Sequence, residues 1–301
     1  FTSTAEVIRY LGAHPVFVDI EPISLNIDPS LIEKAITAKT KAIIPVHLGG
    51  LPCDMNAILQ IARKHNLKVI EDAAHAFPVG YKGKMIGTLD SDVTVFSFYA
   101  TKTITTGEGG MLVTKDPKIA ARVRTMRLHG IDRDAFDRYT SDKPSWYYEI
   151  VAPGYKYNMT DIAASIGIHQ LKKADVFKDR RSQIAHAYLK ELESLPIELP
   201  SSYLNNGDNA WHLFQIRIKE EAPLSRDAFI IKMTEDGVGC SVHFIPLHMQ
   251  PYYKNNYDLK DCDFPVATKV FSQIASLPIY TKMTDADVSS VIEKIHEVLS
   301  K

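Results

Sequence analysis

The chain has 301 residues, with 35 Lys and Arg against 36 Asp and Glu, and 45% of its residues are hydrophobic. This length suits about two average domains and exceeds the needs of one small core. The formal net charge of −1 gives no reason to expect a polyanionic partner such as a nucleic acid or an acidic membrane surface.

Residues 1–115 alternate short apolar runs with helical periods. We expect strands over residues 15–19, 41–46, 67–72, 92–98 and 110–114, and helices over residues 30–36 and behind an N-cap at Asp54. Short β-rich runs separated by helices of about a dozen residues indicate βαβ crossovers and a mainly parallel sheet. Such a sheet carries helices on both faces and binds its ligands at the carboxyl ends of its strands.

The later residues predict a smaller α/β unit. Residues 131–145 are polar and aromatic and indicate a long surface excursion, and helices are expected near Thr160 and over residues 176–195. A strand over residues 211–218 and helices over residues 226–236 and behind a cap at 284–287 follow. We place the boundary on the long helix, with a large domain over residues 1–180 and a small C-terminal domain over residues 181–301.

The cysteines and the apolar runs bear on location. Cys53, Cys240 and Cys262 are odd in number and far apart, which argues against a disulfide framework and a metal site and fits a reducing compartment. No apolar run reaches the roughly 18 residues of a membrane span. The first residues lack the basic region of a signal peptide and an initiator Met. We therefore expect a cytoplasmic protein with no membrane partner and no metal.

A lysine follows an expected strand end in the segment Ser97–Gly110, among small, hydroxylated and glycine residues. Lys102 could stand at the ligand-binding edge of the sheet, with hydroxyls and backbone N–H groups ready for an anion. Composition alone favours the simpler interpretation, a solvent-exposed lysine in a tight glycine turn. The pattern G-x-x-x-x-G-K-[ST] is absent, so the segment is not a P-loop.

An acid ends the apolar strand expected over residues 67–72. Asp72 could ligate Mg²⁺, bind a ribose hydroxyl or pair with a protonated heterocycle, and an N-cap or a solvent-facing acid is about as plausible. His75 follows, and a lone histidine is more often structural than catalytic. Considered together, Asp72 and Lys102 form the arrangement that pyridoxal phosphate needs, because the lysine binds the aldehyde and the acid keeps the ring nitrogen protonated.

Five segments in chain order carry a resemblance to a known family. Residues 71–76, 97–102, 106–110, 153–162 and 243–248 are similar to the DegT/DnrJ/EryC1/StrS family of nucleotide-sugar aminotransferases. The resemblance spans essentially the whole chain. It implies the α/β architecture of fold-type I aminotransferases, the cofactor pyridoxal 5'-phosphate, and a homodimer whose active sites lie at the subunit interface.

The resemblance also implies roles for individual residues. Lys102 would bind the cofactor covalently and move the proton between the substrate and the cofactor. Asp72 would pair with the pyridine nitrogen, and His75 would lie near the ring and its 3-hydroxyl. Ser97 would donate a hydrogen bond to the phosphate.

The resemblance extends to three further positions: one matches the family, one departs from its common residue and one is a weaker candidate. Phe1 matches an aromatic residue that stacks on the cofactor ring. Lys156 stands where the family often has Asn, at a position that reaches the phosphate of the neighbouring subunit, and a cation there still suits a phosphate. Asn158 is a weaker candidate for that region. Family members carry a glycine–threonine phosphate loop before the position that matches Phe1, so we expect the large domain of this chain to lack its N-terminal part.

The resemblance implies transfer of an amino group from L-glutamate to a nucleotide-linked keto-sugar. The segment Arg133–Tyr139 looks like members that act at C4 of UDP-linked sugars, in amino-sugar, lipopolysaccharide or other surface-glycan biosynthesis. One alternative is a sugar dehydratase on the same scaffold, in which His replaces the lysine, so Lys102 argues against it. Another is a non-catalytic relative that binds the cofactor or a nucleotide sugar, which the missing phosphate loop favours.

Other polar residues have simpler explanations. His243 and His248 flank Pro246 and could either face the substrate or pack a turn. The pair Arg180–Arg181 predicts a solvated or dimer-packing helix face. His47, beside two glycines, could line the entrance of the site, and we leave it out of the site residues.

Overall fold

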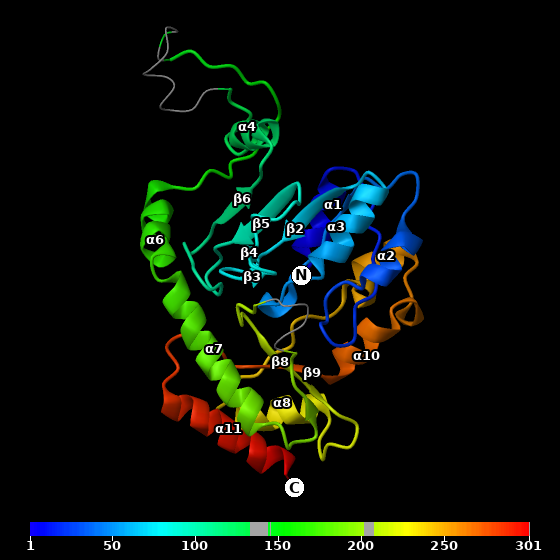
Figure 1. The fold of residues 1–301 in the computed structure, drawn as a ribbon, viewed down its shortest axis with the longest axis vertical. Helices are drawn as coiled ribbons and strands as arrows, with labels where there is room; N and C mark the ends of the chain where they lie inside the picture. Colours follow the sequence, from blue (N-terminus) through cyan, green and yellow to red (C-terminus); the bar gives the residue numbers. More distant parts are fainter. Residues whose placement is uncertain (133–143, 145, 202–207, 301) are drawn as a thin grey trace.

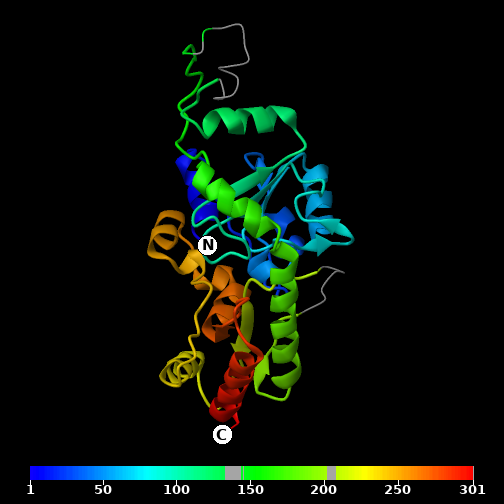
Figure 2. The ribbon, with the colours of Figure 1, turned by 90° about the vertical axis from the view of Figure 1, so that its left-hand side faces the viewer.

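Figure 1 shows the computed structural model, which describes residues 1–132, 144, 146–201 and 208–300. Two α/β layers lie one above the other in this view, and the N-terminus lies between them. The long helix α7 (Ala174–Glu191) runs from the upper layer down beside α11 (Asp285–Leu299), as Figure 2 also shows. The chain is a mixed α/β protein in which parallel strand pairs dominate the upper sheet, as expected.

The upper sheet has the strand order β1-β2-β5-β6. Its strands are β1 (Ala42–Ile43), β2 (Lys68–Asp72), β5 (Val93–Ser97) and β6 (Gly110–Val113). β1, β2 and β5 pair in parallel, whereas β6 runs antiparallel to β5. The carboxyl ends of β2 and β5 therefore meet at one edge. A separate hairpin joins β3 (Gly80–Tyr81) to β4 (Lys84–Met85).

The prediction of a strand over residues 15–19 is wrong. These residues belong to no strand ladder, and a single bridge joins Ile20 to Ile27 just beyond them. Val16 is exposed, whereas Asp19 is buried. The apolar run is thus an extended connection that ends on a buried acid.

The carboxylate of Asp19 caps a helix that lies far along the chain. It accepts hydrogen bonds from the backbone N–H groups of Val266 (2.9 Å) and Ala267 (3.0 Å), at the start of α10 (Pro265–Gln273). The helix's own N-cap residue, Phe264, has no side-chain acceptor. Asp19 therefore satisfies amides that a helix N-terminus leaves without intrahelical partners.

The helices around the upper sheet begin where capping residues stand. They are α1 (Ser3–Tyr10), α2 (Pro29–Ala35), α3 (Met55–Lys64), α4 (Pro117–Met126) and α6 (Asp161–Leu171). Asp54 accepts a hydrogen bond from Ala57 at the start of α3, and Thr160 accepts one from Ala163 at the start of α6. The cap expected at Asp54 and the helix start expected near Thr160 are confirmed. The buried face of α3, with Met55 and Ile58, packs into the hydrophobic core of the upper layer.

The lower layer contains an antiparallel sheet in the order β7-β8-β9. Its strands are β7 (Ile197–Glu198), β8 (Phe214–Ile218) and β9 (Ile274–Leu277), and α8 (Arg226–Glu235) packs with them. Helix α9 (Pro251–Tyr257) lies beside the beginning of the chain, where Tyr253 contacts Phe17. The core of the lower layer gathers aromatic and branched side chains, among them Tyr188, Phe214, Phe229 and Ile295. The predicted domain boundary after residue 180 falls inside α7 and stays a prediction.

The arginine pair on α7 does not form a solvated face. Arg181 is buried, and its Nη1 atom donates to the carbonyl oxygens of Trp211 (3.0 Å) and Ile279 (2.9 Å). Burial lowers the pKa of Arg181 to about 10. The expectation is wrong for this residue because its long side chain reaches carbonyls of the lower layer, which local sequence does not reveal.

The surface excursion expected over residues 131–145 falls mainly on positions 133–143 and 145. These positions lie outside the described residues. The segment Arg133–Tyr139, on which the UDP-sugar subgroup depends, is among them. Within the described ranges, none of the helices combines the length and the apolar character that crossing a bilayer requires.

Candidate active site

The strand ends of the upper sheet bring the expected acid and lysine segments together. Asp72 is the last residue of β2 and pairs with Val95 in the parallel ladder with β5. Two residues further on, Ser97 ends β5, and the chain then turns through residues 99–103. Asp72 and the turn that carries Lys102 therefore start from the same edge of the sheet.

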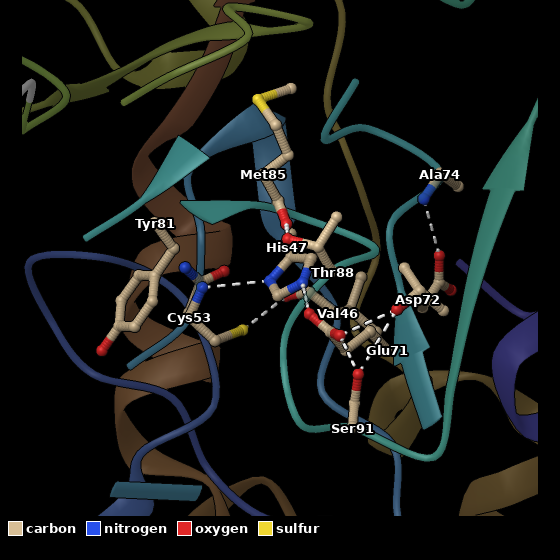
Figure 3. A network of polar contacts seen from close by, with 12 residues as sticks. Val46, His47, Cys53, Glu71, Asp72, Ala74, Tyr81, Met85, Thr88 and Ser91 are labelled. Carbon is tan, nitrogen blue, oxygen red and sulfur yellow. Dashed lines mark hydrogen bonds and ion pairs between the residues drawn. The ribbon is translucent and has the colours of Figure 1, made fainter. Parts of the chain in front are cut away.

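Two hydrogen bonds hold the carboxylate of Asp72. Its Oδ2 atom accepts from the Thr4 hydroxyl at 2.7 Å, and its Oδ1 atom accepts from the backbone N–H of Ala74 at 3.1 Å (Figure 3 shows the second). Thr4 lies on α1. Sequence reasoning did not find Thr4, because 68 residues separate it from Asp72.

Lys102 stands half-buried in a tight turn, with its backbone N–H donating to the Tyr99 carbonyl at 3.0 Å. Burial lowers the pKa of Lys102, and the negative charge of Asp72 acts in the opposite direction. The two groups are thus close enough to interact electrostatically. This placement overturns the simpler interpretation of a solvent-exposed loop lysine.

The loop after Lys102 returns to the strand end. The Thr105 hydroxyl donates to the Phe98 carbonyl at 3.1 Å, and the Thr106 hydroxyl donates to the Glu108 carbonyl at 2.6 Å. Gly109 has φ +157°, and a Cβ there would come within 2.3 Å of the Thr106 hydroxyl. Glycine is therefore required for the loop to pass so close to Thr106.

His75 is buried, and its ring packs on a second imidazole. Its Nδ1 atom accepts from the Gly49 N–H at 3.3 Å, so the ring proton lies on Nε2. The ring centroids of His75 and His212 are 4.3 Å apart. Burial, followed by the positive charge of Lys102, holds the pKa of His75 well below its usual value, so this imidazole is neutral at pH 7.

His212 was not found from sequence. It is buried, and its Nδ1 atom has no hydrogen-bond partner in the part of the chain that the structure describes. Burial, and then the nearby His75, hold the pKa of His212 well below its usual value. The residue precedes β8 in the lower layer, and nothing local in its sequence marks it as a neighbour of His75.

Aromatic rings complete one side of the site. Phe1 lies 5.5 Å from Phe244 between ring centroids, and Phe244 lies 6.3 Å from His75. His243 donates to or accepts from the Ser276 hydroxyl at 2.9 Å, and burial, with a smaller effect of Lys102, lowers the pKa of His243. The structure therefore brings Phe1 and His243 to the cluster around Lys102.

The remaining predicted residues divide into two groups. Ser97 stands half-buried at the strand end, where its hydroxyl accepts from the Tyr99 N–H at 3.3 Å. Lys156 is exposed, and its amine donates to the side-chain oxygen of Asn158. Among the described residues, no hydrogen bond, ion pair or ring contact joins Lys156 or Asn158 to Asp72 or Lys102.

His248 lies apart from the site. It is buried in the lower layer, where its Nε2 atom lies 3.0 Å from the Thr268 hydroxyl and its ring stacks on Phe264 at 4.6 Å. These contacts show that it packs a turn. Of the two histidines around Pro246, only His243 has an electrostatic interaction with Lys102.

The arrangement suits a flat, basic heterocycle. An acid held by two donors can balance a protonated ring nitrogen, a half-buried amine with a lowered pKa can react as a nucleophile or a base, and aromatic rings can pack against a planar ligand. No group of three or more His, Cys, Asp or Glu residues is placed to hold a metal ion in the described ranges.

Comparisons with known proteins agree on one family. The model of the DegT/DnrJ/EryC1/StrS aminotransferase family matches residues 1–296. The uncharacterized protein MJ1066 of Methanocaldococcus jannaschii is 51% identical over 302 residues, which cover 100% of this chain and 78% of that protein. The spore coat polysaccharide biosynthesis protein SpsC of Bacillus subtilis is 46% identical over 301 residues, which cover 99% and 77%.

A solved structure extends this likeness to the fold. The PMP-form of Spr1654 from Streptococcus pneumoniae, assigned as a sugar aminotransferase, is 33% identical with a TM-score of 0.92, and the match covers 99% of this chain and 79% of that one. The PLP-form of the same protein gives a TM-score of 0.90 at 32% identity.

Proposed function

This chain belongs to the DegT/DnrJ/EryC1/StrS aminotransferase family, and from that premise we propose that it transfers an amino group from L-glutamate to a nucleotide-linked keto-sugar. It is a PLP-dependent aminotransferase of a family that acts on sugars. The observation that carries the proposal is the meeting of Lys102, Asp72 and His75 at one edge of the upper sheet.

The residues at this edge fit pyridoxal phosphate. Lys102 supplies the amine that the aldehyde needs, Asp72 supplies a counter-charge for the ring nitrogen, and His75 and Phe1 supply flat neighbours. Ser97 would hold the phosphate through its hydroxyl. When bound, the cofactor accepts the electron pair that remains after a proton leaves the α-carbon of an amino acid.

Lys102 is proposed as the proton-transferring residue. Only the neutral amine can accept a proton, and burial lowers the pKa of Lys102, so its neutral fraction at a given pH exceeds that of an ordinary lysine. The negative charge of Asp72 opposes this effect. Burial and the charge of Asp72 together therefore determine how much of the Lys102 amine is neutral at a given pH.

The other residues are proposed to orient the Asp72 and His75 side chains and to exclude water. Thr4 and the Ala74 N–H aim the Asp72 carboxylate, and the Gly49 N–H fixes the His75 ring. Because His75 is neutral, it can donate from Nε2 without adding a second positive charge beside Lys102. The buried rings of His75 and His212 also exclude water from one side of the site.

The nature of the substrate is a proposal based on likeness. SpsC is a spore coat polysaccharide biosynthesis protein, and this supports a sugar destined for a surface glycan, of which lipopolysaccharide is one kind. We propose a UDP-linked 4-keto sugar as acceptor. The segment that favours this subgroup, Arg133–Tyr139, lies outside the described residues.

A direct assay tests the function. Pyridoxal phosphate added to the full-length protein is expected to give a visible absorbance band that L-glutamate bleaches, with formation of 2-oxoglutarate. A panel of UDP-, GDP- and dTDP-linked 3- and 4-keto sugars should then restore the band, most rapidly with the UDP-linked 4-keto sugar. A protein that gives no band is a binding relative, and one that releases water from the sugar without amination is a dehydratase.

We propose that the protein is a homodimer that uses the surface of α6. No residue of α6 is buried, although its sequence is apolar, and Ile162 on its surface is 78% exposed. An apolar surface of this kind marks an interface. Lys156 and Asn158 precede α6 and would reach the partner's site from this interface.

Sedimentation of the full-length protein tests the dimer. Ile162→Glu is expected to weaken dimerisation by at least about tenfold, because a buried charge would face the partner. Ile231→Glu is the matched control, since Ile231 is also exposed but lies on α8. A wild-type protein that sediments as a monomer would contradict the proposal.

We also place the reaction in the cytoplasm. The support is that Cys53, Cys240 and Cys262 are all free thiols, as a reducing compartment requires. Cell fractionation that recovers the protein in another compartment would overturn this placement.

A further inference from the structure

A cluster of polar side chains lies in the core beside Asp72 (Figure 3). Glu71 precedes Asp72 on β2, and successive residues of a strand point to opposite faces. Glu71 and His47 are both 0% exposed, with His47 Nε2 3.0 Å from Glu71 Oε2. The candidate active site uses neither side chain.

The hydrogen bonds define the charge of this pair. His47 Nδ1 accepts from the backbone N–H of Cys53 at 3.0 Å, so that nitrogen carries no proton. The single ring proton lies on Nε2 and is donated to Glu71. A neutral imidazole beside a carboxylate leaves one negative charge in the core.

Further donors keep Glu71 ionised. It accepts from the Ser91 hydroxyl and from the Thr94 hydroxyl, the latter at 2.8 Å. The three donors, His47 Nε2 and the Ser91 and Thr94 hydroxyls, offset the cost of burying the charge of Glu71. The groups that face Glu71 thus come from the turn after β1, the loop before β5 and β5 itself.

Backbone hydrogen bonds connect the cluster to the cofactor-facing residues. The His47 N–H donates to the Asp72 carbonyl at 3.1 Å, and the Asp72 N–H donates to the Pro45 carbonyl at 2.9 Å. Two residues after His47, the Gly49 N–H donates to His75. A displacement of His47 would therefore move both Asp72 and the support of the His75 ring.

We propose that Glu71, held by His47, is a positioning residue that supplies a second negative charge next to Asp72 and fixes the strand end and turn that aim Asp72 and His75. The inference rests on the proposed function. In the low dielectric of the core, this charge increases the proton affinity of a base bound to Asp72. His47 adds no positive charge that would cancel it.

Glu71→Gln tests the charge while preserving the shape. The amide can still accept from His47 and donate to Ser91 or Thr94. With pyridoxal phosphate bound, the pH midpoint of the visible absorbance should fall by about one unit, and kcat should fall with little change in KM for glutamate. Glu33→Gln, at an exposed glutamate paired with Lys64, is the matched control and should leave both unchanged. If shape alone matters, Glu71→Gln keeps the wild-type midpoint, and the inference is overturned.

A second measurement needs no cofactor and no variant. Nitrogen-15 NMR of the cofactor-free wild type should show His47 protonated at Nε2 and not at Nδ1. A proton on Nδ1 would refute the buried negative charge even if Glu71→Gln failed to fold. If the wild type gives no visible band with pyridoxal phosphate, the proposed function is refuted. The NMR of His47 then still decides whether Glu71 carries a buried negative charge.

Discussion

Lys102→Ala is expected to abolish transamination, with a loss of at least about 10³-fold in kcat. The variant removes the amine that binds the aldehyde and also the base that moves the α-proton. The visible band that forms in the wild type with pyridoxal phosphate should be absent. Stopped-flow absorbance with L-glutamate and a keto-sugar measures both losses.

Lys115→Ala is the matched control for Lys102→Ala. Lys115 is an exposed lysine of the same layer, paired with Asp90 at 3.3 Å, and its removal should leave the band and the turnover unchanged. A Lys102→Ala protein that kept both the band and the turnover would end the assignment of Lys102. Circular dichroism should confirm that both variants fold.

Asp72→Asn is expected to reduce kcat/KM by about 10²-fold or more. The amide has the same shape and can still accept from Thr4, but it cannot balance the charge of a protonated ring nitrogen. Asp90→Asn is the control, because Asp90 is an exposed acid paired with Arg63 and Lys115. Equal kcat/KM values for Asp72→Asn and the wild type would exclude the proposed role.

Asp72→Asn can also be tested without the cofactor, through the pKa of Lys102. The charge of Asp72 raises the pKa of Lys102 against the effect of burial, so Asp72→Asn should lower this pKa further. Amine-reactive labelling followed by mass spectrometry measures the pH at which Lys102 becomes neutral. In the wild type that pH should lie below the ordinary value of a lysine, and it should be lower still in Asp72→Asn. An unchanged pH would show that Asp72 and Lys102 do not interact.

The sequence predicted the upper sheet well where strand, turn and cap signals agreed. β2 and β5 lie within a residue or two of the expected strands, and Asp72 stands at a strand end as expected. Apolar character alone could not identify a strand over residues 15–19, because an extended connection and a strand have the same local sequence pattern. Neighbours along the chain determine a strand's conformation, but its pairing depends on distant residues.

The candidate site was predictable only in part, for the same reason. Lys102, Asp72, His75 and Phe1 follow from the family resemblance, and the structure brings them together. Thr4 and His212 reach the site from distant elements, and no local period marks such contacts. Arg181 was misjudged because a helical pair of arginines gives no sign of the carbonyls that one of them will meet.

The cap that Asp19 provides for α10 joins the beginning of the chain to a helix near its other end. The acid and the amides it binds are 247 and 248 residues apart in sequence. Pulling them apart would leave a buried carboxylate and two amides unpaired, at a cost of about 1–3 kcal/mol for each lost bond. Any motion that separates α10 from the segment around Asp19 is therefore disfavoured, so this contact fixes two segments from opposite ends of the chain against each other.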